Sequence, residues 1–313
     1  MQFFVAVTDN DWCSFLAELR PDELNFWRPS GGSFRAIEEG SPFLFKLHSP
    51  LNFIVGGGFF VRHSVLPLSL AWEAFGMKNG APDLGTFHQQ IMKYRGARAG
   101  DEADPNIGCT ILASPFFIDQ EDWIPAPSDW SRSIVRGKTY DTQEPNGAGL
   151  WEQVQRRLAQ QYEVFDYGVD GTLLIAEERG QYGAEYLTRA RLGQGAFRIL
   201  VTDAYQRRCA VTGERTLPVL QAAHIKPYVD SGPHRVDNGI LLRADLHILL
   251  ERGYMTLTEA LQIEVSRRIK EDFENGEEYY GLQGNNLEVV PASVMDRPSV
   301  EFIRWHNENR FLG

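Results

Sequence analysis

The sequence predicts an α+β fold in which a strongly curved, strand-rich domain over residues 1–130 is joined by a helical linker over 131–188 to a second domain over 189–313. Three observations predict this fold. Short β-type runs broken by Gly and Pro dominate the first part, an amphipathic helical stripe follows, and a strand–strand–helix pattern occupies the last part. With 313 residues and 43% hydrophobic content, the chain can bury a substantial core, and its length suggests two domains.

The N-terminal strands are predicted from runs of aromatic and β-branched residues, and one helix is predicted to begin near Leu68. The predicted strands are Phe3 to Val7, Phe43 to Leu47, Phe53 to Val55 and Phe59 to Arg62. Residues 56–58 are three glycines between the last two runs, where a bulge or a close backbone approach is the usual reason for glycine. There we favour a turn over contact with a ligand.

Residues 101–129 hold seven acids and no Lys or Arg, and four prolines interrupt the stretch. Because proline breaks long regular elements, we expect an interdomain surface there and a linker after it. The run from Trp151 to Tyr162 has apolar residues spaced by three and four positions, which predicts one stripe along a connecting helix.

The C-terminal domain is predicted to begin with a helix from Gly195 to Gln206, followed by strands at Val219 to Tyr228 and Gly239 to Leu242. The loop between these strands holds Gly232, Pro233 and His234. A short helix comes next, with Asp245 placed to cap it and Gly253 suited to the left-handed position after its end. Two further strands near Met255 and Gln262 and a final helix near Val300 complete the domain.

A net charge of −11 argues against wholesale coating of a polyanion, because nonspecific nucleic-acid affinity comes largely from Lys and Arg. The distribution is uneven, since residues 189–252 hold ten Lys or Arg against six acids. This locally basic segment also carries the histidines discussed below. Chance clustering of arginines on a solvated face is an equally open interpretation.

The three cysteines, Cys13, Cys109 and Cys209, lie about a hundred residues apart, so no CxxC pair is available to hold zinc. Any metal must then be held mainly by His, Asp or Asn. No run of 18 apolar residues occurs, and the N-terminal residues include acids where a signal peptide needs basic and apolar regions. We expect a cytoplasmic protein without a membrane partner.

His224, Asn238 and His247 are the candidate catalytic residues, because a histidine on the first strand and one at the start of the helix can face each other. A neutral imidazole can take a proton from water near neutral pH, and a divalent cation can neutralise charge on a phosphate. Each residue taken alone also has a structural interpretation: a hydrogen-bonded histidine, a turn asparagine and a surface histidine.

The segment from Cys209 to Tyr254 resembles the HNH (ββα-metal) endonucleases, particularly a subfamily of predicted bacterial restriction enzymes that reads CxVTG, AHIxP, NGxxL, DxH and RGY. The resemblance implies that His224 is the general base, that Asn238 braces the loop and orients this base, and that His247 binds a divalent metal, Mg²⁺ or else Mn²⁺ or another transition metal.

This chain departs from the HNH pattern in two places. Ala223 stands where many members carry an acidic or histidine metal ligand, so Asp245 is the candidate second ligand, although capping the helix is an equally good role. Some members hold a structural zinc between two CxxC pairs, of which only Cys209 remains. We therefore expect no structural zinc.

Residues 1–95 resemble the N-terminal part of the same predicted restriction proteins, with VTDxxW, NFW, FLFKL and AWExFGxxNG as shared words. Their arrangement is similar to that of the PUA-like curved β-barrels, which include EVE, YTH and SRA-type domains, and several of these bind a modified or flipped base. Such a base needs flat apolar walls and a few polar groups. The candidate base contacts are Trp27, Asn25, Phe60 and Arg28, with core packing as the alternative for any single aromatic residue.

Taken together, the two resemblances imply a modification-dependent DNA endonuclease of bacterial defence that binds double-stranded DNA through a modified cytosine. Because one HNH site cuts one strand, we expect a homodimer. Two alternatives stay open: a restriction enzyme that reads an unmodified sequence, and a nucleic-acid-binding regulator in which the HNH unit is only a scaffold.

Overall fold

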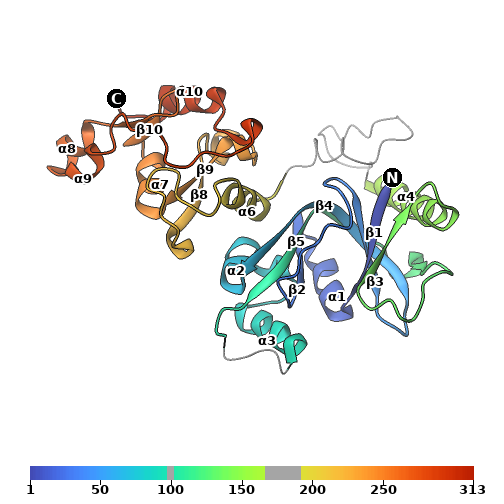
Figure 1. The fold of residues 1–313 in the computed structure, drawn as a ribbon. Helices are drawn as coiled ribbons and strands as arrows, with labels where there is room; N and C mark the ends of the chain where they lie inside the picture. The colour runs from blue at the N-terminus through green and yellow to red at the C-terminus, as the bar shows by residue number, and fades with distance from the viewer. Residues whose placement is uncertain (97–101, 166–191) are drawn as a thin grey trace. The chain divides into compact units, whose positions relative to one another are not determined.

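The computed structural model describes residues 1–96, 102–165 and 192–313, and the chain divides into two compact units, 1–190 and 191–313 (Figure 1). Within the described residues, no helix has the length and apolar character needed to cross a membrane. Each unit combines helices with antiparallel strand pairs, so the predicted α+β class is confirmed.

The N-terminal unit is built on a seven-stranded sheet in the part of the chain that the structure describes. Its strands run in the order β2-β5-β4-β3-β1-β7, with β6 paired to β4. The pairing of β1 with β3 is parallel and the other pairings are antiparallel. The strands are β1 (Gln2–Thr8), β2 (Glu23–Arg28), β3 (Pro42–Leu47), β4 (Phe53–Pro67), β5 (Asn106–Phe117), β6 (Ile124–Pro125) and β7 (Gly137–Asp141).

Helices pack on both faces of this sheet because side chains alternate along each strand. On β1, Phe3 and Val5 join a core with Trp151 and Val154 of α4, whereas Ala6 joins a second core with α1. The apolar stripe predicted for this connecting helix thus packs on the sheet as far as Leu158, and the side chain of Tyr162 lies outside the described residues. The helices are α1 (Asn10–Leu19), α2 (Leu68–Phe75), α3 (Leu84–Arg95) and α4 (Pro145–Phe165), with 3₁₀ turns at Gly76–Asn79 and Gln120–Asp122.

The three glycines at 56–58 do not form a turn; they lie inside the long strand β4. A Cβ atom on Gly56 would stand 2.4 Å from the carbonyl oxygen of Phe116, and one on Gly57 would stand 2.7 Å from that of Phe43. The glycines are required because the neighbouring strands approach too closely for a side chain. The predicted close backbone approach is confirmed and the turn is wrong.

Two predictions for residues 101–188 are also wrong. The prolines do not prevent a long element, because β5 runs through Pro115 with a register shift at that point and Ser114 at φ 45°. Residues 131–158 are not a linker: β7 pairs with β1, and Leu158 of α4 is buried against the sheet. Residues 166–188 of the predicted linker lie outside the described residues.

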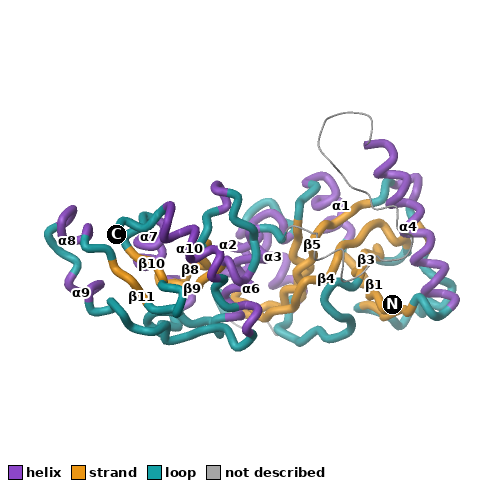
Figure 2. Tube along the Cα trace, turned by 90° about the horizontal axis from the view of Figure 1, so that it is seen from above, coloured by secondary structure: helices purple, strands orange, loops and turns teal. Residues whose placement is uncertain are grey.

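The C-terminal unit contains the predicted strand–strand–helix arrangement, with β8 and β9 side by side in Figures 1 and 2. Leu220 and Leu242 from the strands pack against Leu246 of α7 and Phe197 of α6 in one core. The elements are α6 (Gln194–Ala204), β8 (Leu220–His224), β9 (Gly239–Arg243), α7 (Ala244–Glu251), β10 (Met255–Leu257), β11 (Ile263–Val265), α8 (Arg268–Phe273), α9 (Glu277–Tyr280) and α10 (Val300–Asn309), with 3₁₀ turns at Leu217–Val219, Tyr228–Asp230, Val236–Asn238 and Val294–Asp296.

The ends of α7 test two predictions about its caps. Gly253 follows the helix with φ 77°, and a Cβ there would stand 2.0 Å from the carbonyl oxygen of Arg310, so the left-handed glycine is confirmed. Asp245 is not the N-cap. The helix begins at Ala244 without a side-chain cap, which places Asp245 inside the first turn.

Candidate functional site

His224 is the last residue of β8 and pairs with Gly239 on β9. Its imidazole stacks on Phe197 of α6 with ring centroids 3.8 Å apart and planes 9° from parallel. A Cβ on Gly239 would come within 3.0 Å of the same phenyl ring and 2.4 Å of Val201, so glycine is what lets the ring pack here. Burial, and then the nearby charges of His234 and His247, lower the pKa of His224 to about 4. The imidazole is therefore neutral at physiological pH.

Asn238 is completely buried and ties the two ends of the loop between β8 and β9 together. Its Oδ1 accepts from the backbone N–H of Lys226 at 2.9 Å. Its Nδ2 donates to the carbonyl oxygens of Lys226 and Pro233, both at 2.9 Å. Because Lys226 is two residues after His224, these bonds hold the chain that carries the histidine, which is the geometry a bracing asparagine requires.

His247 lies in α7 and is held by polar side chains at both ring nitrogens. Its Nδ1 is 2.6 Å from Oε1 of Gln221 on β8, and its Nε2 is 3.4 Å from Oε1 of Glu251, one helical turn further on. Burial lowers the pKa of His247, and the Glu251 carboxylate partly opposes this shift. The charge of His247 in turn contributes to the lowered pKa of His224.

Asp245 is paired with Arg243 rather than with His247. Its two carboxylate oxygens accept from Nε and Nη2 of that guanidinium at 2.7 and 2.8 Å, and this interaction lowers the pKa of Asp245. The carboxylate near His247 belongs to Glu251, which the sequence analysis missed. The i,i+4 spacing of these two residues on a helix is the signal that could have found it.

His234 is a second site residue that the sequence pattern does not single out, because the pattern places it only in the loop between the strands. Its Nδ1 lies 2.9 Å from Nε2 of His224, and its ring stacks on Tyr228 with centroids 4.6 Å apart and planes 7° from parallel. Its position four residues before Asn238, inside the loop that Asn238 braces, could have indicated that it reaches the site.

Among the residues that the structure describes, no group of three His, Cys, Asp or Glu side chains is close enough to hold one metal ion. Cys209 is buried, and its Sγ accepts from the backbone N–H of Arg243 at 3.4 Å. The imidazole nitrogen of His247 and the carboxylate of Glu251 form the best donor pair. Two protein donors suit an ion such as Mg²⁺, which keeps several waters and binds substrate phosphate.

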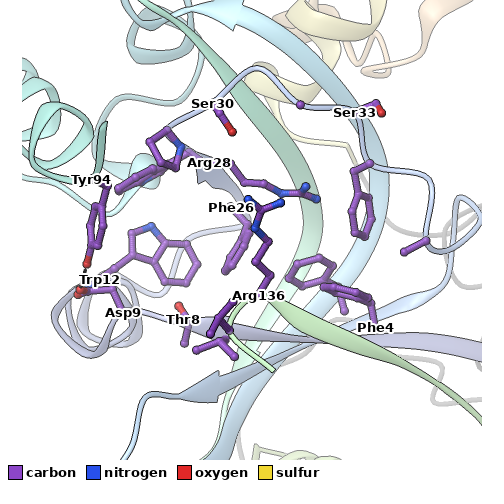
Figure 3. Close-up of a pocket in the computed structure, with 18 of the residues that line it drawn as sticks. Phe4, Thr8, Asp9, Trp12, Phe26, Arg28, Ser30, Ser33, Tyr94 and Arg136 are labelled. Atoms are coloured by element: carbon purple, nitrogen blue, oxygen red, sulfur yellow. Dashed lines mark hydrogen bonds between the residues drawn. The ribbon is translucent and has the colours of Figure 1, made fainter. Parts of the chain in front are cut away.

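A second candidate site is a cavity of about 590 Å³ in the N-terminal unit (Figure 3). Aromatic side chains form much of its wall: Phe4, Trp12, Phe26, Trp27, Phe34, Phe43 and Tyr94. Arg28 from β2 and Arg136, which precedes β7, extend over this wall, and the Arg28 guanidinium lies 4.8 Å from the centre of the Phe34 ring. Burial and the charge of Arg136 lower the pKa of Arg28. Neither arginine forms an ion pair with any residue in the described part of the chain.

Asn79, in the 3₁₀ turn after α2, positions the tryptophans of this cavity. Its backbone carbonyl accepts from the indole N–H of Trp12 at 2.9 Å and of Trp27 at 2.8 Å. Its side-chain Oδ1 accepts from Nδ2 of Asn25 at 2.8 Å, and its Nδ2 donates to the carbonyl oxygen of Ala71 at 3.1 Å. A completely buried polar residue thus fixes two walls of the cavity.

The four predicted base contacts divide into two pairs. Trp27 and Arg28 line the cavity. Asn25 and Phe60 do not, because the Asn25 side chain is completely buried against Asn79 and Phe60 is 5% exposed within the core. The predicted base-contacting role does not fit the placement of these two residues.

Comparison with known proteins identifies the class of the C-terminal site. Residues 209–258 match the family model "HNH endonuclease", and this segment contains His224, Asn238 and His247. The chain therefore carries an HNH endonuclease domain, and it is a nuclease. No curated protein matches the chain.

Two solved structures are similar to parts of the chain. The ASCH protein from Zymomonas mobilis has a TM-score of 0.35 and 9% identity, covering 48% of this chain and 94% of that one. The modification-dependent TagI restriction endonuclease has a TM-score of 0.27 and 13% identity, covering 93% of this chain and 76% of that one. At these scores the likeness assigns neither a ligand nor an activity to this chain.

Proposed function

We propose that the protein is a restriction endonuclease that recognises double-stranded DNA containing modified cytosine and hydrolyses its phosphodiester backbone. The observation that carries this proposal is the arrangement of His224, Asn238 and His247 on the strand, loop and helix of the matched HNH segment. The sequence words shared with predicted bacterial restriction enzymes support the restriction role.

In the proposed reaction, His224 accepts a proton from the attacking water. Its ring is neutral at pH 7 and is held between Phe197 and the braced loop, so little reorganisation is needed. Asn238 keeps that loop in place through its bonds to Lys226 and Pro233.

His247 and Glu251 would hold a divalent cation, Mg²⁺ or else Mn²⁺ or another transition metal. Nδ1–H of His247 donates to Oε1 of Gln221, which fixes the ring and leaves Nε2 beside the Glu251 carboxylate. This is the usual way that a second residue orients a histidine ligand. When bound, the cation supplies positive charge to the phosphoryl and leaving oxygens. The HNH resemblance implies products with 5′-phosphate and 3′-hydroxyl ends.

The N-terminal cavity is the proposed reader of the modified base. Its volume is ample for an extruded base, and Trp27 offers a flat wall while Arg28 and Arg136 offer positive charge beside it. Two arginines without a carboxylate partner in the described residues are suited to the phosphates that flank such a base.

We further propose a homodimer, because one HNH site cuts one strand and a double-strand break requires two such events. Sedimentation equilibrium with and without DNA measures the assembly directly. A monomer that makes only single-strand nicks would contradict this part of the proposal.

The experiment that tests the function compares matched plasmids containing cytosine, 5-methylcytosine or 5-hydroxymethylcytosine, incubated with Mg²⁺, Mn²⁺ or a chelator. We expect metal-dependent cutting of the modified plasmids by the wild-type protein and none by His224→Ala. Equal cutting of the unmodified plasmid would replace the reader role with recognition of ordinary sequence. Binding without cutting under every condition would indicate a regulator instead of a nuclease.

A further inference from the structure

We propose that His234 is the proton-accepting partner of His224, so that two imidazoles act as a relay that carries the proton of the attacking water to solvent. This inference rests on the proposed nuclease function and extends it to a residue outside the His224, Asn238 and His247 set. It is carried by the direct hydrogen bond between the two rings, 2.9 Å from Nε2 of His224 to Nδ1 of His234.

The surroundings of the two rings make this contact a fixed one. His224 is stacked on Phe197, and His234 is stacked on Tyr228. The loop that carries His234 is tied at its neighbouring residue, since Asn238 donates to the carbonyl oxygen of Pro233. Each ring therefore has an aromatic support, and the bond between them does not depend on a freely rotating side chain.

The hydrogen bond decides which nitrogen of His224 can act as the base. Because Nε2 of His224 is engaged by His234, the remaining nitrogen is Nδ1, which makes no hydrogen bond with any residue in the ranges 1–96, 102–165 and 192–313. The productive proton arrangement has Nε2–H of His224 donating to Nδ1 of His234, which leaves a lone pair on Nδ1 of His224.

The relay conserves protons and needs no further reactant. Water gives one proton to Nδ1 of His224, and the Nε2 proton of His224 crosses to Nδ1 of His234. His234 is half-buried, and through its exposed part it releases its own Nε2 proton to solvent. The hydroxide attacks phosphorus, and both imidazoles finish neutral in the opposite tautomer. Transfer in the reverse direction after product release restores the starting arrangement.

A proton that reaches His224 must be passed on, because His224 in these surroundings holds a proton poorly. Burial, His234 and His247 lower its pKa to about 4, so an isolated imidazolium at this position is unfavourable at pH 7. A hydrogen-bond acceptor on the far side of the ring stabilises the proton as it arrives and gives it an exit. Among the described residues, His234 and His247 are the titratable groups that act on His224, and Glu251 acts on His247 in turn.

The test uses two substitutions that distinguish proton transfer by His234 from a purely structural role in holding the His224 ring. His234→Asn keeps an acceptor oxygen near the position of Nδ1 but cannot pass a proton on, whereas His234→Ala removes the side chain and leaves room for added imidazole. His88→Ala, in α3 of the N-terminal unit, serves as the histidine control. Single-turnover cleavage is measured from pH 5 to 9 together with the dissociation constant for DNA.

The relay predicts that both His234 variants cleave about 10²-fold more slowly than the wild type at saturating DNA, with unchanged DNA affinity. It also predicts that imidazole in the buffer restores cleavage by His234→Ala and not by His234→Asn. A rate within twofold of the wild type for His234→Asn, or a lack of rescue of His234→Ala, would overturn the relay.

A second measurement keeps this inference separate from the nuclease assignment. Histidine ¹⁵N shifts of the protein without added metal report the titration of His224, whose pKa should rise in His234→Asn because the positive charge that His234 gains on protonation at low pH is lost. An unchanged His224 titration would contradict the coupling of the two rings. If the wild-type protein cuts no DNA but this coupling is observed, the nuclease function fails while the contact between the rings stands.

Discussion

The two candidate sites differ in whether their polar and charged side chains are paired with one another. In the C-terminal site, polar side chains are paired with one another: His224 with His234, His247 with Gln221 and Glu251. In the N-terminal cavity, aromatic walls surround two arginines that have no ion-pair partner among the described residues. The first arrangement suits proton transfer, which needs fixed and matched groups, and the second suits binding of an anionic ligand that supplies the missing charge.

The largest expected effect comes from removing His247, which should separate chemistry from recognition. We predict that His247→Ala lowers the cleavage rate by about 10³-fold or more and leaves the DNA dissociation constant within threefold, because the cavity residues are unchanged. Gel-based cleavage and fluorescence anisotropy on the same DNA measure both quantities. A parallel loss of binding would mean that the C-terminal site also holds the DNA.

The next effect distinguishes the two acidic residues of α7. Glu251→Gln should raise the Mn²⁺ concentration required for half-maximal cleavage by about 10²-fold, because a carboxylate donor beside His247 is lost. Asp245→Asn serves as the matched variant, and it should change this requirement little because Asp245 is paired with Arg243. A larger increase in the Mn²⁺ requirement for Asp245→Asn than for Glu251→Gln would indicate that Asp245 is the metal ligand.

The cavity arginines should affect affinity and not chemistry. We predict that Arg28→Ala and Arg136→Ala each weaken DNA binding about 10-fold. Each should also lower the slope of log affinity against log salt concentration by about one, which corresponds to one fewer ion released on binding. Arg304→Ala is the control, since that arginine is already paired with Glu259 at 2.7 Å. If both cavity variants show the same salt slope as the wild type, Arg28 and Arg136 do not bind DNA phosphates.

Substitution of Asn79 should lower the stability of the N-terminal unit, because Asn79 supports the cavity walls without lining the cavity. Asn79→Ala leaves the amide N–H of Asn25 and the carbonyl oxygen of Ala71 without their partner, so we expect the N-terminal unit to lose about 2 kcal/mol of unfolding free energy. Urea titration followed by tryptophan fluorescence measures this loss. The backbone carbonyl that serves Trp12 and Trp27 remains, so a DNA affinity more than tenfold weaker would contradict the assigned role.

The smallest effect is on stability against pH. Because the pKa of His224 falls from its ordinary value near 6.5 to about 4 in the folded protein, the unfolded chain binds more protons between these values. The contribution of neutral His224 is fully present above pH 6.5 and is lost as the pH falls toward 4. His224→Gln should flatten the melting temperature over this window, and an identical pH profile would contradict the buried, neutral state.

The local parts of the fold could be predicted from the sequence. The β8–β9 pair, α7, Gly253 and the stripe on α4 follow from periodicity and turn chemistry within short windows. The strand β5 could not be predicted from the sequence, because Pro115 is accommodated by a register shift opposite β4 that depends on long-range pairing. The strand position of the glycines at 56–58 could not be predicted for the same reason, since the strands that approach them closely are distant in sequence.

The two candidate sites also differ in how well the sequence predicts them, because one is local in sequence and the other is not. His224, Asn238 and His247 lie within 24 residues, so their spacing was informative, and His234 and Glu251 were missed only because each also has an ordinary role in a loop or on a helix face. The cavity is assembled from Trp12, Trp27, Tyr94 and Arg136, which come from elements far apart in the chain. No local pattern identifies such a set, so the sequence predicts Asn25 and Phe60 as base contacts and does not indicate Tyr94 or Arg136.

The central claim is that His224 and His247 act on one phosphodiester of a modified DNA. Single-turnover cleavage of a 5-methylcytosine duplex with Mn²⁺ at pH 7.5 tests it most directly, with wild type, His224→Ala and His247→Ala compared at saturating protein. We predict cutting by the wild type alone, with both variants still bound to the duplex. Cutting by either variant at a rate within tenfold of the wild type would contradict it.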